Sequence, residues 1–101
     1  PPERRVELYR IAHEALNNVM KHAGASQVVV TAYARDGDGE LCIRDNGQGF
    51  TPEDVPPGHL GLSTMKERAA SIGAVLTVDS DPGQGTEVNV AWKEKAADEP
   101  K

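Results

Sequence analysis

The sequence predicts an α+β domain, a two-layer sandwich with helices on one face of a mostly antiparallel mixed sheet. The first observation behind this prediction is the order of elements, which reads helix, hairpin, loop, helix, hairpin. The second is the alternation of apolar and polar residues in the expected strands, which gives a sheet one core face and one wet face. The length of 101 residues allows one domain with a modest core. We place this domain at residues 1–93 and expect the charged tail at residues 94–101 to be disordered.

The first expected element is an amphipathic helix from about residue 3 to residue 22. Its apolar residues recur at spacings of three and four: Leu8, Ala12, Ala15, Leu16 and Val19. Gly24 follows as a C-terminal stop. The spacing therefore predicts a helix that buries one stripe against the sheet.

Four polar residues of this helix fall within about one quarter of its circumference on a helical wheel: Arg10, Glu14, Asn18 and Lys21. This sector is predicted to lie nearly opposite Leu8, Ala12 and Val19. A carboxylate, an amide oxygen and cations on one face can hold a hydrated Mg²⁺ and its phosphates. A solvated face with Glu and Lys pairs explains the same pattern, so the helix alone leaves both interpretations open.

Four strands are expected in two hairpins. Residues 27–35 are rich in β-branched side chains, and the turn DGDG at residues 36–39 leads into a second strand at residues 40–45. The second hairpin joins residues 74–79 to residues 86–92 through the turn SDPGQG.

Between the hairpins, the segment TPEDVPPG contains three prolines, which exclude regular helix or sheet. A second amphipathic helix follows and ends at Gly73. Its apolar positions are Leu62, Met65, Ala69 and Ile72.

Strand parity predicts a pocket wall. Residues two apart share a face of a strand, so Asp45 lies on the face of Leu41 and Ile43. Thr86 likewise shares the face of Val88 and Val90. If the aliphatic residues face the helices, Asp45 and Thr86 enter the same space between the two layers.

Three glycine-containing segments adjoin these elements. RDNGQGF is either a turn with positive φ at Gly47 and Gly49 or a site where Asp45 accepts a hydrogen bond from a ligand's exocyclic amine, such as that of adenine. GHLGLSTMKERA places glycines before a helix, where N–H groups and the helix dipole favour an anion. GQGTEVNV positions Thr86 to assist Asp45, although a plain hairpin turn accounts for this segment on its own.

Composition excludes several classes of function. The formal net charge of −5 argues against non-specific binding to nucleic acid or anionic membrane. The single cysteine, Cys42, excludes an internal disulfide or a Cys-rich zinc cage and fits a reducing compartment. No apolar run approaches the ~18 residues of a membrane span, so we expect a soluble domain. Because the chain begins with Pro1 and Pro2, we also expect a piece of a longer polypeptide.

The order of four segments carries a family resemblance. EALNNVMKHA, DNGQGF, GHLGLSTMKERA and GQGTEVNV resemble the N, G1, G2 and G3 boxes of the ATP-binding domain of sensor histidine kinases. This is the Bergerat fold, shared with DNA gyrase, the Hsp90 chaperones and MutL. The resemblance runs from about Tyr9 to Ala91. The short segment TPEDVPPG and the segment GLSTMKERAASIGAVLTVDSDPGQGTEV at residues 61–88 look most like the NarL-partnered kinases, which include the nitrate sensors and the DesK-type thermosensor.

The resemblance implies ATP and Mg²⁺ as ligands and assigns roles in the first box. Asn18 would coordinate the Mg²⁺ that bridges the triphosphate. Glu14 would orient water or serve as a base, and could reach the metal through water. Lys21 and His22 would contact phosphate or ribose, with Lys21 counted among the catalytic residues.

The same resemblance implies how the base is bound. Asp45 would bind the adenine amino group, directly and through a water held near Thr86. Gly47 and Gly49 would shape the adenine pocket, and Phe50 belongs to the implied ATP-binding set.

In the second glycine segment, Gly61 and Leu62 would offer backbone N–H groups to the phosphates. Residues 51–59 would form a lid that includes His59 as an ATP-binding residue. This lid seems too short to fold independently, so we expect it to be poorly ordered without nucleotide.

The chain also departs from the family pattern. The family's phosphate-accepting histidine lies on a separate upstream dimerisation helix, and none of His13, His22 and His59 has that context. The resemblance therefore implies a domain that binds ATP and transfers the γ-phosphoryl group to a histidine outside this chain. The family also has strand residues before its first helix, and their absence would leave a sheet edge open.

The implied partners are the upstream dimerisation and histidine-acceptor domain and, through the full-length kinase, a NarL-type response regulator. We expect a monomeric, cytoplasmic domain with no nucleic-acid or direct membrane contact, whether or not the full-length protein is anchored in the cytoplasmic membrane.

Two alternatives remain open: an anti-sigma-factor-type serine kinase of the same fold and a non-catalytic nucleotide-sensing interaction module. The combination of Glu14, Asn18, Asp45 and Gly49 argues against the second, because a domain free of nucleotide has no physical need for it. A gyrase-like or chaperone-like ATPase would carry a longer lid and a transducer domain.

Overall fold

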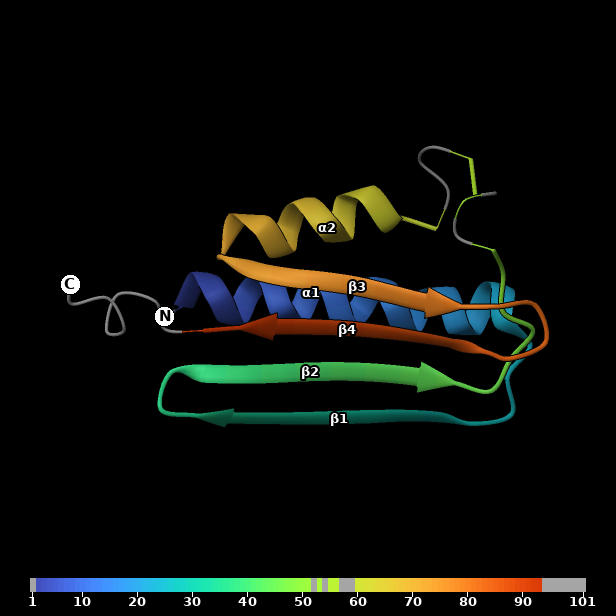
Figure 1. The fold of residues 1–101 in the computed structure, drawn as a ribbon, viewed down its shortest axis with the longest axis horizontal. Coiled ribbons are helices and arrows are strands. Elements are labelled where there is room, and N and C mark those ends of the chain that lie inside the picture. The colour runs from blue at the N-terminus through green and yellow to red at the C-terminus, as the bar shows by residue number, and fades with distance from the viewer. Residues whose placement is uncertain (1, 52, 54, 57–59, 94–101) are drawn as a thin grey trace.

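The computed structural model describes residues 2–51, 53, 55–56 and 60–93 (Figure 1). The predicted order of elements is confirmed. The helices and strands are α1 (Pro2–Asn18), a π-helical turn (Val19–Ala23), β1 (Val28–Arg35), β2 (Asp38–Asp45), α2 (Leu62–Ser71), β3 (Ala74–Ser80) and β4 (Thr86–Trp92). Gly24, at φ 61°, ends the first helix as expected, because a left-handed residue cannot continue it. The expected lid and charged tail lie largely outside the described residues.

The four strands form one sheet in the order β1-β2-β4-β3. All three pairings between described strands are antiparallel. The described part of the sheet is therefore fully antiparallel and not mixed. Both predicted hairpins are present. The central pairing of β2 with β4 joins them, and it brings together strands that are distant in sequence.

The first hairpin turn is shorter than the predicted four residues. Asp36 and Gly37 have φ values of 54° and 88°, and β2 already begins at Asp38. Two consecutive residues with positive φ are typical of the two-residue turns that match strand twist. The predicted start of the second strand at residue 40 is therefore two residues late.

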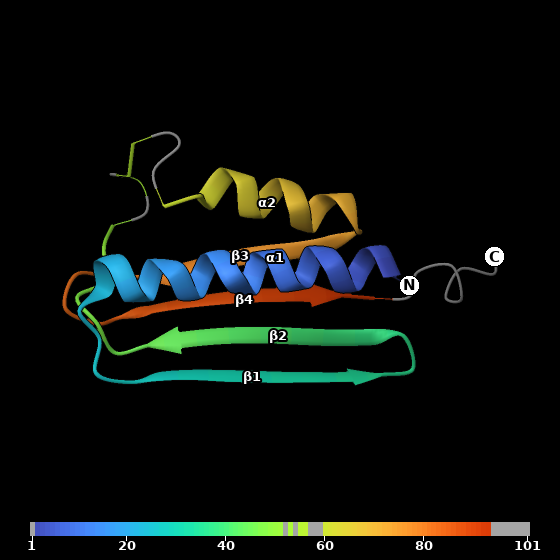
Figure 2. The same ribbon diagram turned by 180° about the vertical axis from the view of Figure 1, so that it is seen from behind.

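Both helices lie on one face of the sheet (Figures 1 and 2). They cover the β3 and β4 side and leave β1 uncovered, and all eight residues of β1 are exposed. Val30 pairs with the buried Ile43 in register but is itself 49% exposed. The layer between helices and sheet is therefore closed over three strands.

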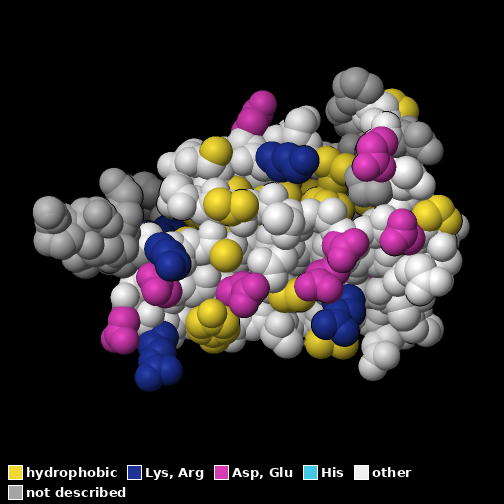
Figure 3. Space-filling model, in the orientation of Figure 1, with side chains coloured by type: hydrophobic (Ala, Val, Ile, Leu, Met, Phe, Trp, Pro, Cys, Tyr) yellow, Lys and Arg dark blue, Asp and Glu magenta, His cyan; other side chains and the backbone are white. Residues whose placement is uncertain are grey.

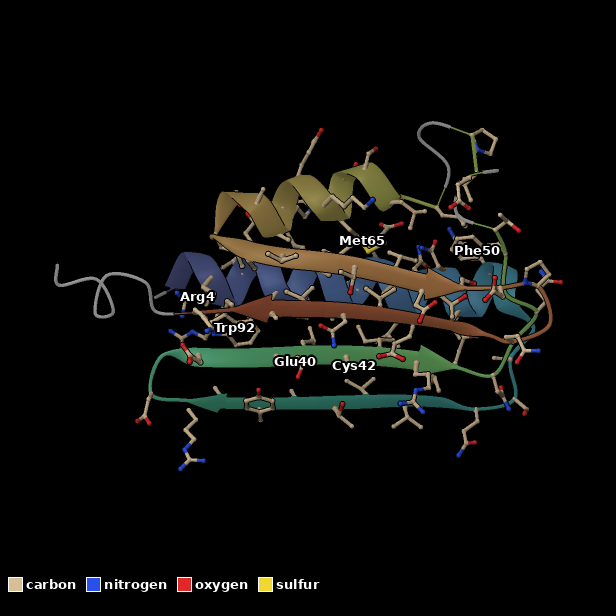
Figure 4. All side chains as sticks on the ribbon, viewed as in Figure 1. Arg4, Glu40, Cys42, Phe50, Met65 and Trp92 are labelled. Carbon is tan, nitrogen blue, oxygen red and sulfur yellow. The ribbon has the colours of Figure 1, made fainter. Side chains whose placement is uncertain are left out.

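The core is built from rows of side chains that cross the sheet. One row joins Ile43, Val88 and Val78, as strand pairing and parity predict. Ile11 of α1 and Met65 of α2 are fully buried against this layer, at 0% exposure. Figure 4 labels Met65 between α2 and the sheet. Each fully buried aliphatic side chain contributes about 1.5–3 kcal/mol, so these rows hold the helices on the sheet.

The predicted position of Asn18 opposite the apolar stripe of α1 is wrong. Ile11, which the predicted stripe omits, and Ala15 are buried, and Asn18 lines a cavity together with Ala15. A turn of about 100° per residue places positions 11, 15 and 18 in one narrow sector. Asn18 therefore ends the buried face of the helix and enters the space between the layers.

The other face of the sheet is solvated, and Figure 3 shows charged side chains spread over it among hydrophobic and other polar ones. Arg44 and Glu87 pair across β2 and β4 at 3.7 Å, and Asn89 donates to Glu40 over 2.6 Å. Cys42 lies between them, with its thiol 3.4 Å from the Glu87 carboxylate. Partial burial is the main cause that raises the pKa of the Cys42 thiol, and the neighbouring Glu87 carboxylate raises it further. The thiol therefore stays protonated at neutral pH.

The ends of both helices and of three strands come together around one location at one end of the sandwich (Figure 1). In an antiparallel sheet of this order, β2 ends at Asp45 and β3 ends at Ser80 beside the start of β4 at Thr86. At the same end, α1 finishes at Asn18 and α2 begins at Leu62. Segments that are far apart in sequence therefore surround one location.

Candidate functional site

A cavity of about 110 Å³ opens where these element ends meet. Its walls are mainly apolar and come from the helices, the sheet and the loop after β2. The lining residues are Ala15, Asn18, Val19, Ile43, Asp45, Gln48, Gly49, Phe50, Leu60, Leu62, Val78, Thr86 and Val88. Figure 4 shows Phe50 at this end of the molecule, close to the end of β3. Mostly apolar walls with few polar groups are typical of small-molecule and cofactor sites.

The floor of the cavity carries a polar row. Asp45 pairs in register with Thr86, and Thr86 pairs with Ser80, so the three side chains point to the helix side together. The predicted placement of Asp45 and Thr86 in one interlayer space is confirmed, since both line the cavity.

Asp45 is buried, with 7% of its surface exposed. The Gly47 amide donates to its Oδ1 over 2.7 Å, an Asx-type turn that fixes the carboxylate. This bond occupies Oδ1 and leaves Oδ2 for a ligand. A buried carboxylate is costly without strong donors, so a ligand N–H group at Oδ2 would be favoured.

The two glycines of RDNGQGF differ in conformation. Gly49 has φ 66°, and a Cβ there would collide with the carbonyl oxygen of Asp81. Gly47 does not have positive φ. The predicted turn with positive φ at both Gly47 and Gly49 is therefore wrong. Gly49 lines the cavity, whereas Gly47 acts through its amide on Asp45.

Gly85 lets β4 start against the end of β2. Its φ is 78°, and a Cβ there would collide with the carbonyl oxygen of Asp45. We expect Gly85→Ala to destabilise the domain by about 2–4 kcal/mol, which combines ~1 kcal/mol of backbone strain with about 1–3 kcal/mol of steric overlap. Urea unfolding measures this loss.

The matched control is Gly83→Ala, in the same turn. Gly83 has a similar φ of 81° but nothing within 4 Å of an added Cβ, so this variant should lose only about 1 kcal/mol. Equal losses in the two variants would contradict the steric role of Gly85.

At the opposite wall, Asn18 holds the chain before α2. Its Nδ2 donates to the Leu60 carbonyl over 2.6 Å. Because a carbonyl only accepts, this bond identifies which side-chain atom is nitrogen and leaves Oδ1 as the free amide oxygen. An amide oxygen is a hard ligand that suits Mg²⁺.

Glu14 lies against the start of α2. A Cβ added to Gly61 would lie 2.7 Å from Glu14 Oε2, and Gly61 has φ 65°. No side chain caps the start of α2, so the N–H groups of its first turn donate to no capping side chain. Leu62, the first residue of α2, lines the cavity, and the helix dipole there favours a phosphate.

The structure divides the polar sector predicted for α1. Arg10 and Glu14 line a second hollow of about 450 Å³ between the helices, together with Tyr9, His13, Thr64, Met65 and Arg68. Arg68 is paired there with Glu7 at 3.1 Å. Lys21 is exposed and lines neither hollow. Asn18 is thus the member of the sector that reaches the cavity.

Two predicted contacts fall where the structure gives no side chain. His22 lies in the π-helical turn, but its side chain is outside the described part, and His59 is outside it altogether.

The sequence analysis did not name Ser80 or Gln48, and among the apolar lining residues it named only Phe50 and Leu62 as site residues. Strand parity could have found Ser80, because it continues the face of Leu76 and Val78. Helical spacing placed Val19 on the same apolar stripe as Ala15, four positions earlier, but did not identify it as a wall of the cavity.

Within the described residues, no cluster of three or more His, Cys, Asp or Glu side chains is arranged to hold a metal. A Mg²⁺ ion that takes most of its ligands from phosphate and water, with one amide oxygen from the protein, fits this site. No helix in the described part is both long and apolar enough to cross a bilayer.

The chain belongs to the family of histidine kinase-, DNA gyrase B- and HSP90-like ATPases, which it matches over residues 3–96. ATP is therefore the nucleotide that a domain of this class binds, and the cavity is the candidate site for its base.

The relatives narrow the class to sensor histidine kinases. The chain is 41% identical over 96 residues to the nitrate/nitrite sensor protein NarQ of Escherichia coli K12, a match covering 94% of this chain and 17% of NarQ. It is 43% identical over 83 residues to the sensor histidine kinase LiaS of Bacillus subtilis 168, covering 82% of this chain and 23% of LiaS. The chain thus spans about a fifth of these relatives.

A solved structure agrees. The histidine kinase domain of the blue-light activated kinase from Erythrobacter litoralis EL346 superposes with a TM-score of 0.78 and 26% identity, over 99% of this chain and 51% of that one. The predicted resemblance to the ATP-binding domain of sensor histidine kinases is confirmed.

Proposed function

We propose that this domain binds Mg-ATP at the described cavity and donates the γ-phosphoryl group to a histidine on a separate dimerisation domain of a sensor histidine kinase. One observation carries the proposal. Asp45 is a buried carboxylate held by the Gly47 amide, and it faces a small apolar cavity whose opposite wall is the uncapped start of a helix.

The base would lie in the cavity. Asp45 Oδ2 accepts from the adenine amino group, and Thr86 supports it from the neighbouring strand. Ile43, Val88 and Phe50 cover the faces of the ring and exclude water. The cavity is small, at about 110 Å³, and mainly apolar, so the phosphates would lie outside it, toward the start of α2.

The phosphates would lie toward the start of α2. The first N–H groups of the helix, beginning at Leu62, donate to phosphate oxygens, and Gly61 lets the chain turn tightly there. Asn18 Oδ1 would hold Mg²⁺, which neutralises phosphate charge when bound. Catalysis then rests on positioning the γ-phosphoryl group in line with the incoming histidine.

We assign Glu14 and Lys21 the roles that their box implies. Glu14 lies beside Gly61, where a carboxylate can orient water or accept a proton. Lys21 is an exposed cation on a flexible side chain in the π-helical turn after α1, from which it can swing toward phosphate. Gly47, Gly49, His22 and His59 complete the proposed nucleotide site.

We further infer that the domain works in the cytoplasm, where ATP is available, within a longer kinase. Its partners would be the dimerisation and histidine-acceptor domain and a NarL-type response regulator. The similarity to NarQ motivates the second partner.

The test is phosphoryl transfer in trans. This chain, mixed with the dimerisation domain of its own kinase and γ-labelled ATP, should label that domain on a histidine, and the product should be labile to acid. Asp45→Ala serves as the binding-deficient control. Acid-stable label on serine would instead support the anti-sigma-factor-type kinase, and binding of ATP without transfer would support a nucleotide-sensing module.

A further inference from the structure

Ser80, the third member of the polar row, joins three segments of the chain next to the cavity. Its side chain is buried at 6% exposure and does not line the cavity itself. Ser80 Oγ accepts from the Phe50 amide at 2.9 Å, donates to the Gly85 carbonyl at 3.0 Å, and lies 2.8 Å from Thr86 Oγ1. These three contacts join the loop after β2, the turn before β4 and the polar row.

The number of donors and acceptors on the Ser80 hydroxyl decides which residue donates in the bond between Ser80 and Thr86. A serine hydroxyl has one proton and two lone pairs. The buried Gly85 carbonyl can only accept, so the Ser80 hydroxyl donates its hydrogen to this carbonyl. The Phe50 N–H donates to one lone pair of Ser80 Oγ. The remaining lone pair must accept, so the Thr86 hydroxyl donates to Ser80. The reverse direction would withdraw a donor from a buried carbonyl, which is unfavourable.

Thr86 consequently has no proton to offer the cavity. Its oxygen presents only lone pairs there, next to the Asp45 carboxylate, which also only accepts. Two adjacent acceptors favour a ligand edge that donates, such as an amino group. They disfavour a carbonyl oxygen at the same place, because neither group can donate to it.

We propose that Ser80 is a positioning residue for base specificity. Because Ser80 accepts the hydrogen bond of the Thr86 hydroxyl, the polar row presents only acceptors and selects a 6-aminopurine over a 6-oxopurine. This proposal rests on the proposed binding of ATP. Ser80 acts through Thr86, whereas Asp45 would touch the base directly.

The experiment measures the affinities of Mg-ATP and Mg-ITP by calorimetry and compares their ratio between variants. Ser80→Ala frees the Thr86 proton to turn toward the 6-oxo group of ITP, and the preference for ATP should fall about five-fold, the value of one neutral hydrogen bond. Ser80→Thr keeps a hydroxyl and should restore the preference. Thermal unfolding checks each variant, and Ser80→Cys, with its weak thiol donor, replaces Ser80→Ala if that variant does not fold.

A double-mutant cycle separates specificity from structure. In the Thr86→Val background, which has no hydroxyl, Ser80→Ala should leave the ratio unchanged. Two outcomes would overturn the proposal: an unchanged ratio in Ser80→Ala, which includes an equal loss of affinity for both nucleotides, or the same fall in ratio in the Thr86→Val background. Each leaves ATP binding by the wild type intact. A wild type that binds neither nucleotide would instead refute the proposed function, and this inference with it.

Discussion

Asp45→Ala is expected to lower the affinity for ATP by about 100-fold. The variant removes a charge-assisted hydrogen bond to the adenine amino group, worth about 1.5–3 kcal/mol, and every 1.4 kcal/mol is tenfold in affinity. It also removes the acceptor of the Gly47 amide, which holds the turn. Calorimetry with Mg-ATP measures the loss.

Asp45→Asn tests the same contact with the turn preserved. The Gly47 amide requires an acceptor, so the new side chain would direct its oxygen there and its NH₂ group into the cavity. Binding of ATP should then fall as in Asp45→Ala, while ITP should gain affinity. Asp79→Ala makes the same charge change at an exposed position of β3 and should bind ATP as the wild type does. If Asp45→Ala bound ATP equally well, the adenine assignment would be wrong.

Asn18→Ala is expected to abolish the gain in ATP affinity that Mg²⁺ gives and to reduce phosphoryl transfer by about 100-fold or more. The variant loses both the Oδ1 ligand and the bond to the Leu60 carbonyl that holds the chain before α2. Titrations of ATP with Mg²⁺ and with a chelator separate these losses. Asn17→Ala, one residue earlier and outside the cavity lining, is the control.

Asn18→Asp divides the two roles. A carboxylate is still a hard ligand for Mg²⁺, but it cannot donate to the Leu60 carbonyl. Metal-free affinity should therefore fall as in Asn18→Ala, while Mg²⁺ still raises the affinity. A Mg²⁺ effect that survives in Asn18→Ala would show that Asn18 is not the metal ligand.

The successes of sequence reasoning came from local rules. Alternation along β2 and β4 placed Asp45 and Thr86 on the core face, and the glycine at the end of α1 marked its stop. The errors arose where a local pattern was ambiguous. The apolar stripe predicted for α1 left out Ile11, so Asn18 was placed on the wrong side of the helix relative to its buried face. The DGDG segment did not indicate that two residues are enough for the hairpin turn.

Ser80 shows why part of the site was out of reach. Its three partners lie 30, 5 and 6 residues away, and its meaning depends on all of them together. No single strand pattern distinguishes a buried serine that accepts and donates from one at a solvated strand end. The direction of a hydrogen bond is a property of the whole network.

The sequence by itself determined the order of elements, the face of each strand and the family, because these depend on periodicity and on residues close together in the chain. The tertiary structure decided which strands pair at the centre of the sheet. Pairing β2 with β4 places Asp45 beside Thr86 and Ser80, and packing α1 against α2 joins Asn18 to Leu60. These contacts depend on the burial of one shared core by elements distant in sequence, so "RDNGQGF" becomes the floor of a site only in the folded chain.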